Sequence, residues 1–230
     1  MIKRIYNIFW IIFFSFFFSS TSAQDYQKLG KEICENISKN DSIPTEKIFI
    51  EFEKYYNLNE EKKNLLISDF NIFSLKLQKE IIKNCSNKLP YLDSYLLMPL
   101  SNIADVEKIF NYEQTKKLEK YLKEIQYKNR LQILVVSTDD YFPNQNIDNY
   151  SFSILNANYS TLFENGGIIF ILNPKDRNIR ISTNQIAKQS LSDEFCQNLI
   201  DEILVPNFKN EKYFEGIEQA VLKIQSKTKL

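Results

Sequence analysis

The sequence predicts an α/β/α sandwich with a small mixed sheet, preceded by a small all-helical N-terminal domain. Two patterns lead to this prediction. From residue 105 onward, short continuous apolar runs alternate with amphipathic helical segments, which is typical of an α/β domain. Between residues 24 and 98, apolar residues recur at helical spacing. The 230-residue chain is 43% hydrophobic and 25% charged, so it has enough apolar surface for a packed core and does not read as disordered.

The N-terminal region is predicted to contain three helices. The longest, over residues 59–84, has apolar side chains at intervals of three or four residues, so they line one face. Shorter helices are expected over 27–38 and 45–56, with breaks at asparagine- and proline-containing segments between them. Met98-Pro99 begins a linker over residues 99–104, and the second domain occupies residues 105–230.

The second domain is predicted to begin with a helix capped by Asn111, with Gln114 placed to complete a capping box. The following apolar run reads as a strand buried on both faces. Two later strands, separated by a short turn containing Pro174, read as a hairpin. The expected elements are a helix at 111–128, a strand at 131–136, a helix at 147–156, strands at 167–172 and 178–182, a helix at 192–204 capped by Ser192, and a helix at 213–226.

The first 23 residues have the pattern of an export signal. Lys3 and Arg4 form a basic start, Phe9–Phe18 is almost entirely apolar, and small residues end at Ala23. The apolar segment is shorter than the roughly 20 residues that a spanning helix needs. We therefore expect cleavage after Ala23, no membrane span afterwards, and a periplasmic, cell-surface or secreted protein.

Cysteine usage agrees with export but leaves two readings open. Cys34 and Cys85 both lie near the ends of predicted helices in the N-terminal region and form a candidate disulfide. Cys196 would then be a small buried apolar residue. The alternative is three unpaired thiols.

Composition excludes several classes of chemistry. The chain has no histidine, which removes Ser-His and Cys-His nucleophiles and imidazole zinc sites. Its 29 basic and 29 acidic residues balance, so net charge gives no case for a nucleic-acid partner. A metal site in such a chain would use carboxylate and amide oxygens, which suit Ca²⁺ or Mg²⁺.

Six short segments, taken in order, carry a family resemblance. They are Asp105–Asn111 (DVEKIFN), the strand LQILVVST, Glu164–Ile171 (ENGGIIFI), Asp176–Ile181 (DRNIRI), Leu191–Asp193 (LSD) and Pro206–Ile217 with its Pro-x-Phe and Gly-Ile ends. Over residues 103–226 the chain resembles the TPM domain family. The resemblance implies an α/β/α sandwich, often exported. It also implies divalent-cation binding and weak acid-phosphatase activity, which have been attributed to some members.

Family resemblance and expected topology together suggest an acidic cation site. Asp105, Glu164 and Asp193 are expected to converge at one edge of the sheet, with amide oxygens from Asn165 and Asn184 in support. Such an oxygen-rich cluster would suit Ca²⁺ or Mg²⁺.

A second-choice site is the pair Asp139 and Asp140, which follows the first core strand at its C-terminal end. The chain departs from the family in two places. It has Glu164 where members usually carry Asp, and Asn184-Gln185-Ile186 where they usually carry Gly-x-Gly. A β-branched Ile186 does not adopt the positive φ that glycine allows, so this loop must differ.

Two functions follow as hypotheses. The first is a non-catalytic interaction or accessory module that binds a protein partner in the cell envelope, with divalent-cation binding as an added property. The alternative is a divalent-cation-dependent phosphatase acting on phosphomonoesters, in which the metal would clamp phosphate oxygens and activate water.

Overall fold

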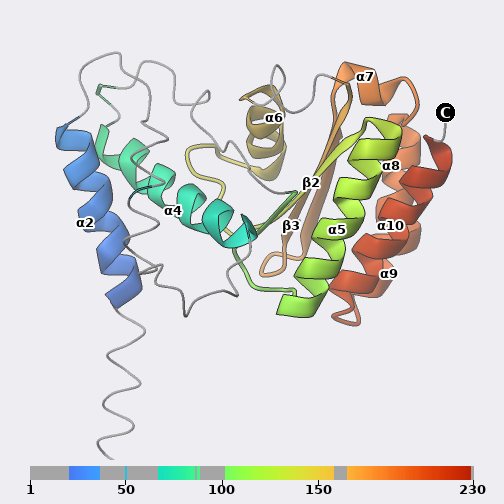
Figure 1. Cartoon of the computed structure of the whole chain (residues 1–230), viewed down its shortest axis with the longest axis horizontal. Coiled ribbons are helices and arrows are strands. Elements are labelled where there is room, and N and C mark those ends of the chain that lie inside the picture. Colours follow the sequence, from blue (N-terminus) through green and yellow to red (C-terminus); the bar gives the residue numbers. More distant parts are fainter. Residues whose placement is uncertain are drawn as a thin grey trace, which may run out of the picture.

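A four-stranded mixed sheet lies at the centre of the computed structural model, which describes residues 21–36, 50, 67–85, 87–88, 102–157 and 165–228. The strand order is β1-β2-β3-β4. Strands β1 (Ile103–Asp105), β2 (Gln132–Ser137) and β3 (Gly167–Asn173) are parallel, and β4 (Asn178–Thr183) is antiparallel to β3. Figure 1 shows helices on both faces of this sheet, which confirms the predicted α/β/α architecture.

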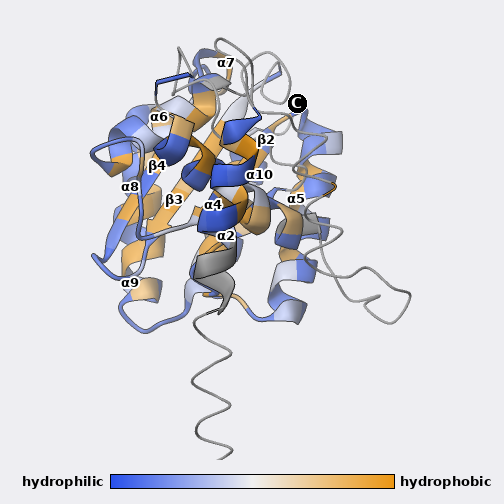
Figure 2. Ribbon diagram, turned by 90° about the vertical axis from the view of Figure 1, so that its left-hand side faces the viewer, coloured by the Kyte–Doolittle hydropathy of each residue, from blue (hydrophilic) through white to orange (hydrophobic). Residues whose placement is uncertain are grey.

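The two central strands are buried along their whole length, as their continuous apolar sequences predict. Their parallel register pairs Gln132 with Gly167 and Ser137 with Leu172. The turn from β3 into β4 forms the predicted hairpin, and Asn173 pairs with Asn178 at its base. Figure 2 shows hydrophobic residues concentrated on these inner strands and hydrophilic residues on the outer faces of the helices.

Strand β1 is the one strand that sequence periodicity does not predict. It has three residues, within and just after the segment expected to be a linker. A run of three shows neither alternation nor a continuous apolar stretch long enough to identify. Its parallel pairing, Ile103 with Val135 and Asp105 with Ser137, adds a strand at the sheet edge and fixes where Asp105 lies.

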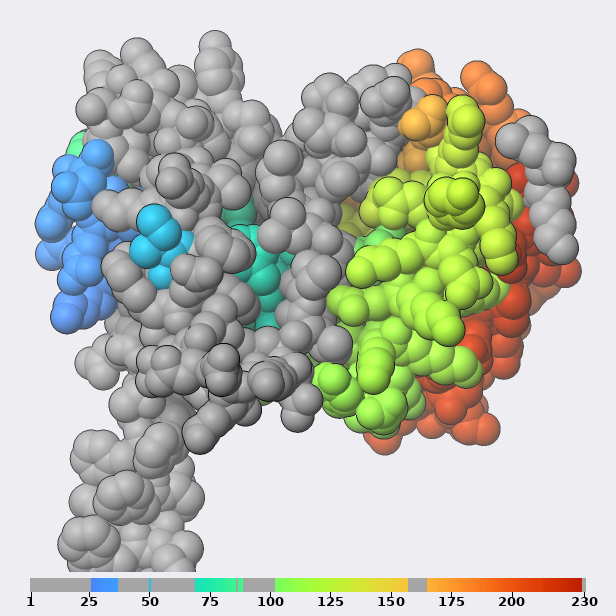
Figure 3. Space-filling model, viewed as in Figure 1, coloured from blue at the N-terminus to red at the C-terminus, as the bar shows by residue number. Residues whose placement is uncertain are grey.

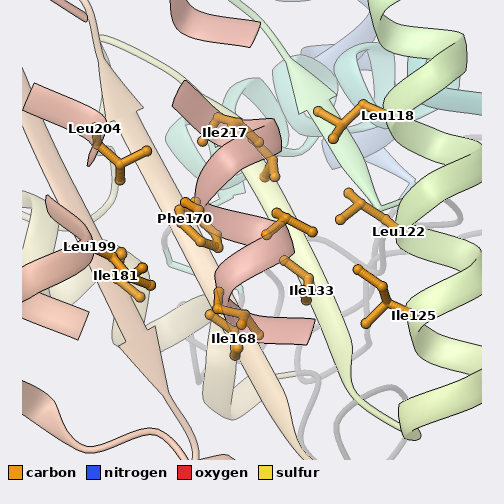
Figure 4. Close-up of a cluster of buried hydrophobic side chains, with 14 of the residues drawn as sticks. Leu118, Leu122, Ile125, Ile133, Ile168, Phe170, Ile181, Leu199, Leu204 and Ile217 are labelled. Carbon is orange, nitrogen blue, oxygen red and sulfur yellow. The ribbon is translucent and has the colours of Figure 1, made fainter. Parts of the chain in front are cut away.

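One face of the sheet is covered by a helical layer from the second half of the chain. Its core includes Phe170 of β3 and Ile217, both fully buried. Figure 4 shows Phe170 and Ile217 in one buried cluster with Leu118, Leu122 and Ile125. The helices of this layer are α5 (Tyr112–Asn129), α8 (Asp193–Leu199), a π-helical turn (Ile200–Leu204), α9 (Val205–Phe208) and α10 (Tyr213–Lys227), with the short α7 (Gln185–Lys188) beside β3 and β4.

The predicted caps of this layer are present. Asn111 accepts a hydrogen bond from the backbone N–H of Gln114, whose side chain returns the contact, so the capping box at the start of α5 is confirmed. Ser192 caps α8 through the N–H of Phe195. In Figure 3, α5 and α10 form a continuous outer surface on this side of the molecule.

The opposite face is covered by α4 (Ile67–Cys85) and α6 (Ile147–Ala157), with α2 (Thr21–Glu35) packed against α4. Phe73 and Leu77 of α4 belong to the same buried cluster as Leu134 and Val136 of β2. The helical N-terminal region therefore shares a hydrophobic core with the sheet.

Helices α2 and α4 approach closely at Gly30. A β-carbon there would lie 2.7 Å from Cβ of Glu80 and 2.9 Å from its backbone carbonyl carbon, so only glycine permits this spacing. Cys34 and Cys85 join the same two helices by a disulfide with a Cα–Cα distance of 5.5 Å. Cys196 is free and buried.

The export segment cannot be compared with the structure, because residues 1–20 lie outside the described residues. The helix expected at 45–56 also lies outside them apart from Ile50, which is helical. No helix in the described part of the chain is long and apolar enough to cross a membrane.

Candidate functional site

Asp105 lies at the edge of the sheet where the parallel strands end. It is the last residue of β1 and pairs with Ser137, the last residue of β2. Asn173 ends β3 at the same edge. In α/β sheets, ligands bind outside the carboxyl ends of the strands. We call this side the C-terminal edge.

The carboxylate of Asp105 is already engaged by three donors from the protein. The backbone N–H of Ile109 donates to Oδ1 at 3.0 Å, and the N–H of Phe110 donates to Oδ2 at 2.9 Å. The hydroxyl of Ser137 donates to Oδ1 at 2.5 Å. Asp105 is 5% exposed, so it organises the turn that leads into α5.

Burial also changes the protonation of Asp105. Desolvation raises the pKa of the Asp105 carboxyl, while the hydrogen bonds from Ser137, Phe110 and Ile109 oppose part of that rise. A raised pKa in the folded state means that the folded chain holds this proton more tightly than the unfolded chain.

We expect the contribution of Asp105 to stability to fall as pH rises. It should be fully present below the unfolded pKa of about 4 and be lost as pH rises through the higher folded pKa. Urea unfolding of the wild type and of Asp105→Asn at pH values from about 3.5 to 7, roughly the range in which a carboxyl titrates, would measure the difference in their free energies of unfolding. The wild type should lose stability relative to the variant on going up this range. If the wild type instead gained stability relative to Asp105→Asn as pH rises, the expected pKa direction would be contradicted.

The second-choice pair, Asp139 and Asp140, also lies at the C-terminal edge, and each carboxylate has a lysine partner. Asp139 Oδ2 lies 3.2 Å from Lys175 Nζ in an exposed ion pair. Asp140 Oδ2 lies 3.3 Å from Lys79 Nζ, and Asp140 Oδ1 accepts from the N–H of Phe142. Burial would by itself raise the pKa of Asp140, but the Phe142 N–H and Lys79 together bring this pKa below its usual value.

Lys79 is the neighbour of the candidate site that sequence reasoning missed. It comes from α4, its side chain is 7% exposed, and it also donates a hydrogen bond to the backbone carbonyl of Asp140. Burial lowers the pKa of Lys79, and the carboxylate of Asp140 opposes that effect. The ammonium lies 5.4 Å from the ring centre of the fully buried Tyr150. One signal was available: Lys79 lies four residues after the buried Leu75 and three before the buried Ile82, on one helical face.

Asn165, Asn184 and Asp193, the other described members of the predicted cation site, lie at the opposite edge, where β3 begins and β4 ends. Oδ1 of Asn184 accepts hydrogen bonds from the N–H groups of Gly167 at 3.1 Å and Ala187 at 2.9 Å. Asp193 is exposed and its Oδ2 lies 2.6 Å from Lys188 Nζ. Asn165 is exposed. Glu164 lies outside the described residues.

The structure does not bring Asp105 together with Asn165 and Asn184. The parallel register places Asp105 beside Ser137 and Leu172, at the far end of β3 from Gly167. Without β1, a carboxylate just before α5 could have reached either edge. With β1 in the sheet, Asp105 must lie at the C-terminal edge, together with Asp139 and Asp140.

The described candidate ligands fit a metal poorly at either edge. No three Asp, Glu, His or Cys side chains in the described part of the chain gather as a metal site requires. The oxygens of Asp105 and Asn184 accept from protein N–H or O–H groups, and Asp139, Asp140 and Asp193 face lysine ammonium groups. Calcium needs six to eight free oxygen ligands, so these contacts would have to be broken first.

Comparison with known proteins gives one family match. The family model described as the TPM domain matches residues 103–227. No curated protein matches this chain. One similar solved structure is the N-terminal domain of a protein from P. gingivalis, at 19% identity and TM-score 0.49, covering 55% of this chain and 81% of that one. Another is the N-terminal domain of the cg2496 protein from Corynebacterium glutamicum, at 14% identity and TM-score 0.45, covering 56% of this chain and 80% of that one.

Proposed function

Because the chain belongs to the TPM domain family, we propose that it is an exported accessory module that binds a protein partner in the cell envelope and does not itself catalyse a reaction. One observation carries this proposal. The carboxylates at the C-terminal edge are bound by the protein's own donors and cations, with Lys79 supplied by the N-terminal helical region.

The contrast with a phosphatase is chemical. Metal-assisted hydrolysis needs a carboxylate set that is free to hold a cation and a water, in a site open to the phosphate. At this edge, Asp105 is buried beneath a turn and the ammonium of Lys79 lies beside Asp140. The chain also lacks a histidine that could act as a base.

Export is supported by two independent features. The first is the basic and then apolar N-terminal pattern that ends at Ala23. The second is the disulfide between Cys34 and Cys85, because disulfides form and persist in oxidising compartments. A periplasmic, cell-surface or secreted location remains the expectation.

Cation binding stays a prediction, and we expect any binding to be weak, because Asp105 lies at the opposite edge of the sheet from Asp193. The pairs Lys175–Asp139 and Lys188–Asp193 are exposed to solvent and contribute little to stability, so Ca²⁺ or Mg²⁺ could compete with these lysines. Asp105 would have to give up three hydrogen bonds to take part, which is far less favourable.

A direct assay separates the accessory module from the phosphatase. Protein purified from the periplasm of an expression host is titrated with Ca²⁺ and with Mg²⁺, by calorimetry and thermal shift, and assayed with p-nitrophenyl phosphate. We expect no hydrolysis above background and no saturable high-affinity cation binding. Magnesium-dependent hydrolysis that is abolished by Glu164→Ala and retained by the matched control Glu194→Ala would establish the phosphatase and overturn the proposal.

A further inference from the structure

A cavity of about 320 Å³ lies between the β3–β4 hairpin and the segment that links α9 to α10. Pro174 and Ile179 line it from the hairpin side, and Val205, Phe208 and Tyr213 line it from the helical side. This volume is at the lower end of the range for small-molecule sites. None of its lining residues belongs to the predicted cation site.

The apolar wall of the cavity is held in place by close packing. The rings of Phe208 and Tyr213 lie 4.9 Å apart at an interplanar angle of 55°. Gly216 of α10 lies directly behind this pair, since a β-carbon there would be 2.7 Å from Cε1 of Phe208. The aromatic surface is therefore positioned before any ligand arrives, which reduces the entropy lost on binding.

The polar part of the cavity carries a positive excess. Arg177 and Lys209 are both exposed lining residues, and neither has an ion pair or side-chain hydrogen bond with any residue that the structure describes. Glu211 is the one acidic residue in the lining. Two cations and one anion favour a ligand with a single negative charge, and a guanidinium is well suited to a carboxylate because it can donate two parallel hydrogen bonds.

We propose that this cavity binds a small aromatic carboxylate. The ring lies against Phe208 and Tyr213, and the carboxylate accepts hydrogen bonds from Arg177 and Lys209. The same chemistry is found in a free aromatic acid and in the C-terminal residue of a peptide, so the test must distinguish these two sources. The proposal does not depend on the accessory role.

The test uses the full protein purified from the periplasm and four probes, followed by NMR titration. 3-Phenylpropionate represents the free acid, and N-acetyl-L-phenylalanine represents the peptide C-terminus. The neutral counterparts are 3-phenylpropan-1-ol and N-acetyl-L-phenylalaninamide. We expect saturable binding of at least one acid, and its neutral counterpart should bind about tenfold or more weakly because the charged hydrogen bonds are lost. The acid that binds more tightly shows whether the cavity takes a free aromatic acid or the C-terminal residue of a peptide.

Variants locate the site. Arg177→Asn suits the left-handed backbone at this position, where φ is 52°, and should weaken binding of the acid about tenfold. Lys209→Gln should weaken it less, because an ammonium donates as a point charge. Lys175→Gln is the matched control, since Lys175 lies in the same turn outside the lining and should leave the affinity unchanged. Absence of saturable binding by both acids, equal binding of the neutral probes, or affinities insensitive to Arg177→Asn and Lys209→Gln would each overturn the proposal.

Discussion

Replacing Asp105 with alanine is expected to lower the free energy of unfolding by about 3–5 kcal/mol. The substitution leaves the N–H groups of Ile109 and Phe110 and the hydroxyl of Ser137 without their acceptor in a buried turn. Each unsatisfied buried donor is unfavourable by roughly 1–3 kcal/mol. Because this turn leads directly into α5, the loss should also weaken packing on that face of the sheet. Urea unfolding followed by circular dichroism measures the change.

Two further variants show whether the loss of stability comes from the lost hydrogen-bond acceptor. Asp105→Asn keeps the size and one acceptor oxygen, so its loss of stability should be smaller. Asp139→Ala removes a carboxylate from the same edge but breaks only an exposed ion pair, so its effect on stability should be much smaller than that of Asp105→Ala. If Asp105→Ala folds with unchanged stability but loses a cation-induced thermal shift, Asp105 is a ligand and the structural role assigned to it is wrong.

Removing the disulfide between Cys34 and Cys85 is expected to destabilise the protein by about 2–5 kcal/mol. The two cysteines are 51 residues apart, so the cross-link closes a long loop in the unfolded chain. It also holds α2 against α4, whose other face packs on the sheet. The double variant Cys34→Ala/Cys85→Ala, compared with the wild type by thermal unfolding, should show a lowered Tm and earlier proteolysis within α2.

The reductant dithiothreitol provides a second measurement. It should lower the Tm of the wild type toward that of the double variant and leave the double variant unchanged. Cys196→Ala is the matched control and should keep the full response to reductant. Burial raises the pKa of the Cys196 thiol to about 11, so little thiolate is present at neutral pH to exchange with the disulfide. An oxidised and a reduced wild type with the same Tm would contradict the expected role of the cross-link.

Much of the fold could be predicted because its signals are local. The buried strands β2 and β3 and the hairpin to β4 agree with the sequence to within about a residue or two, the usual uncertainty of an element boundary. The caps at Asn111 and Ser192 were also correctly placed. In each case the periodicity, the apolar run or the capping residue lies within the element that it defines, so no distant contact is needed to recognise it.

The candidate site could not be predicted to the same extent, because it depends on contacts between distant segments. The edge at which Asp105 lies is decided by the pairing of β1 with β2, across about thirty residues of chain, and a three-residue strand carries no periodic signal. Lys79 reaches Asp140 across 61 residues, and only the docking of α4 on the sheet shows that contact.

The sequence by itself determined most of the elements, the family and the absence of histidine chemistry, since these follow from local pattern and composition. The tertiary structure decided which polar groups meet. It placed Asp105 with Asp139 and Asp140, brought Lys79 and Lys175 to those aspartates, and set Arg177 and Lys209 beside an aromatic wall. The physical reason is that packing a shared core between the sheet and helices from both ends of the chain fixes polar side chains that no local pattern relates.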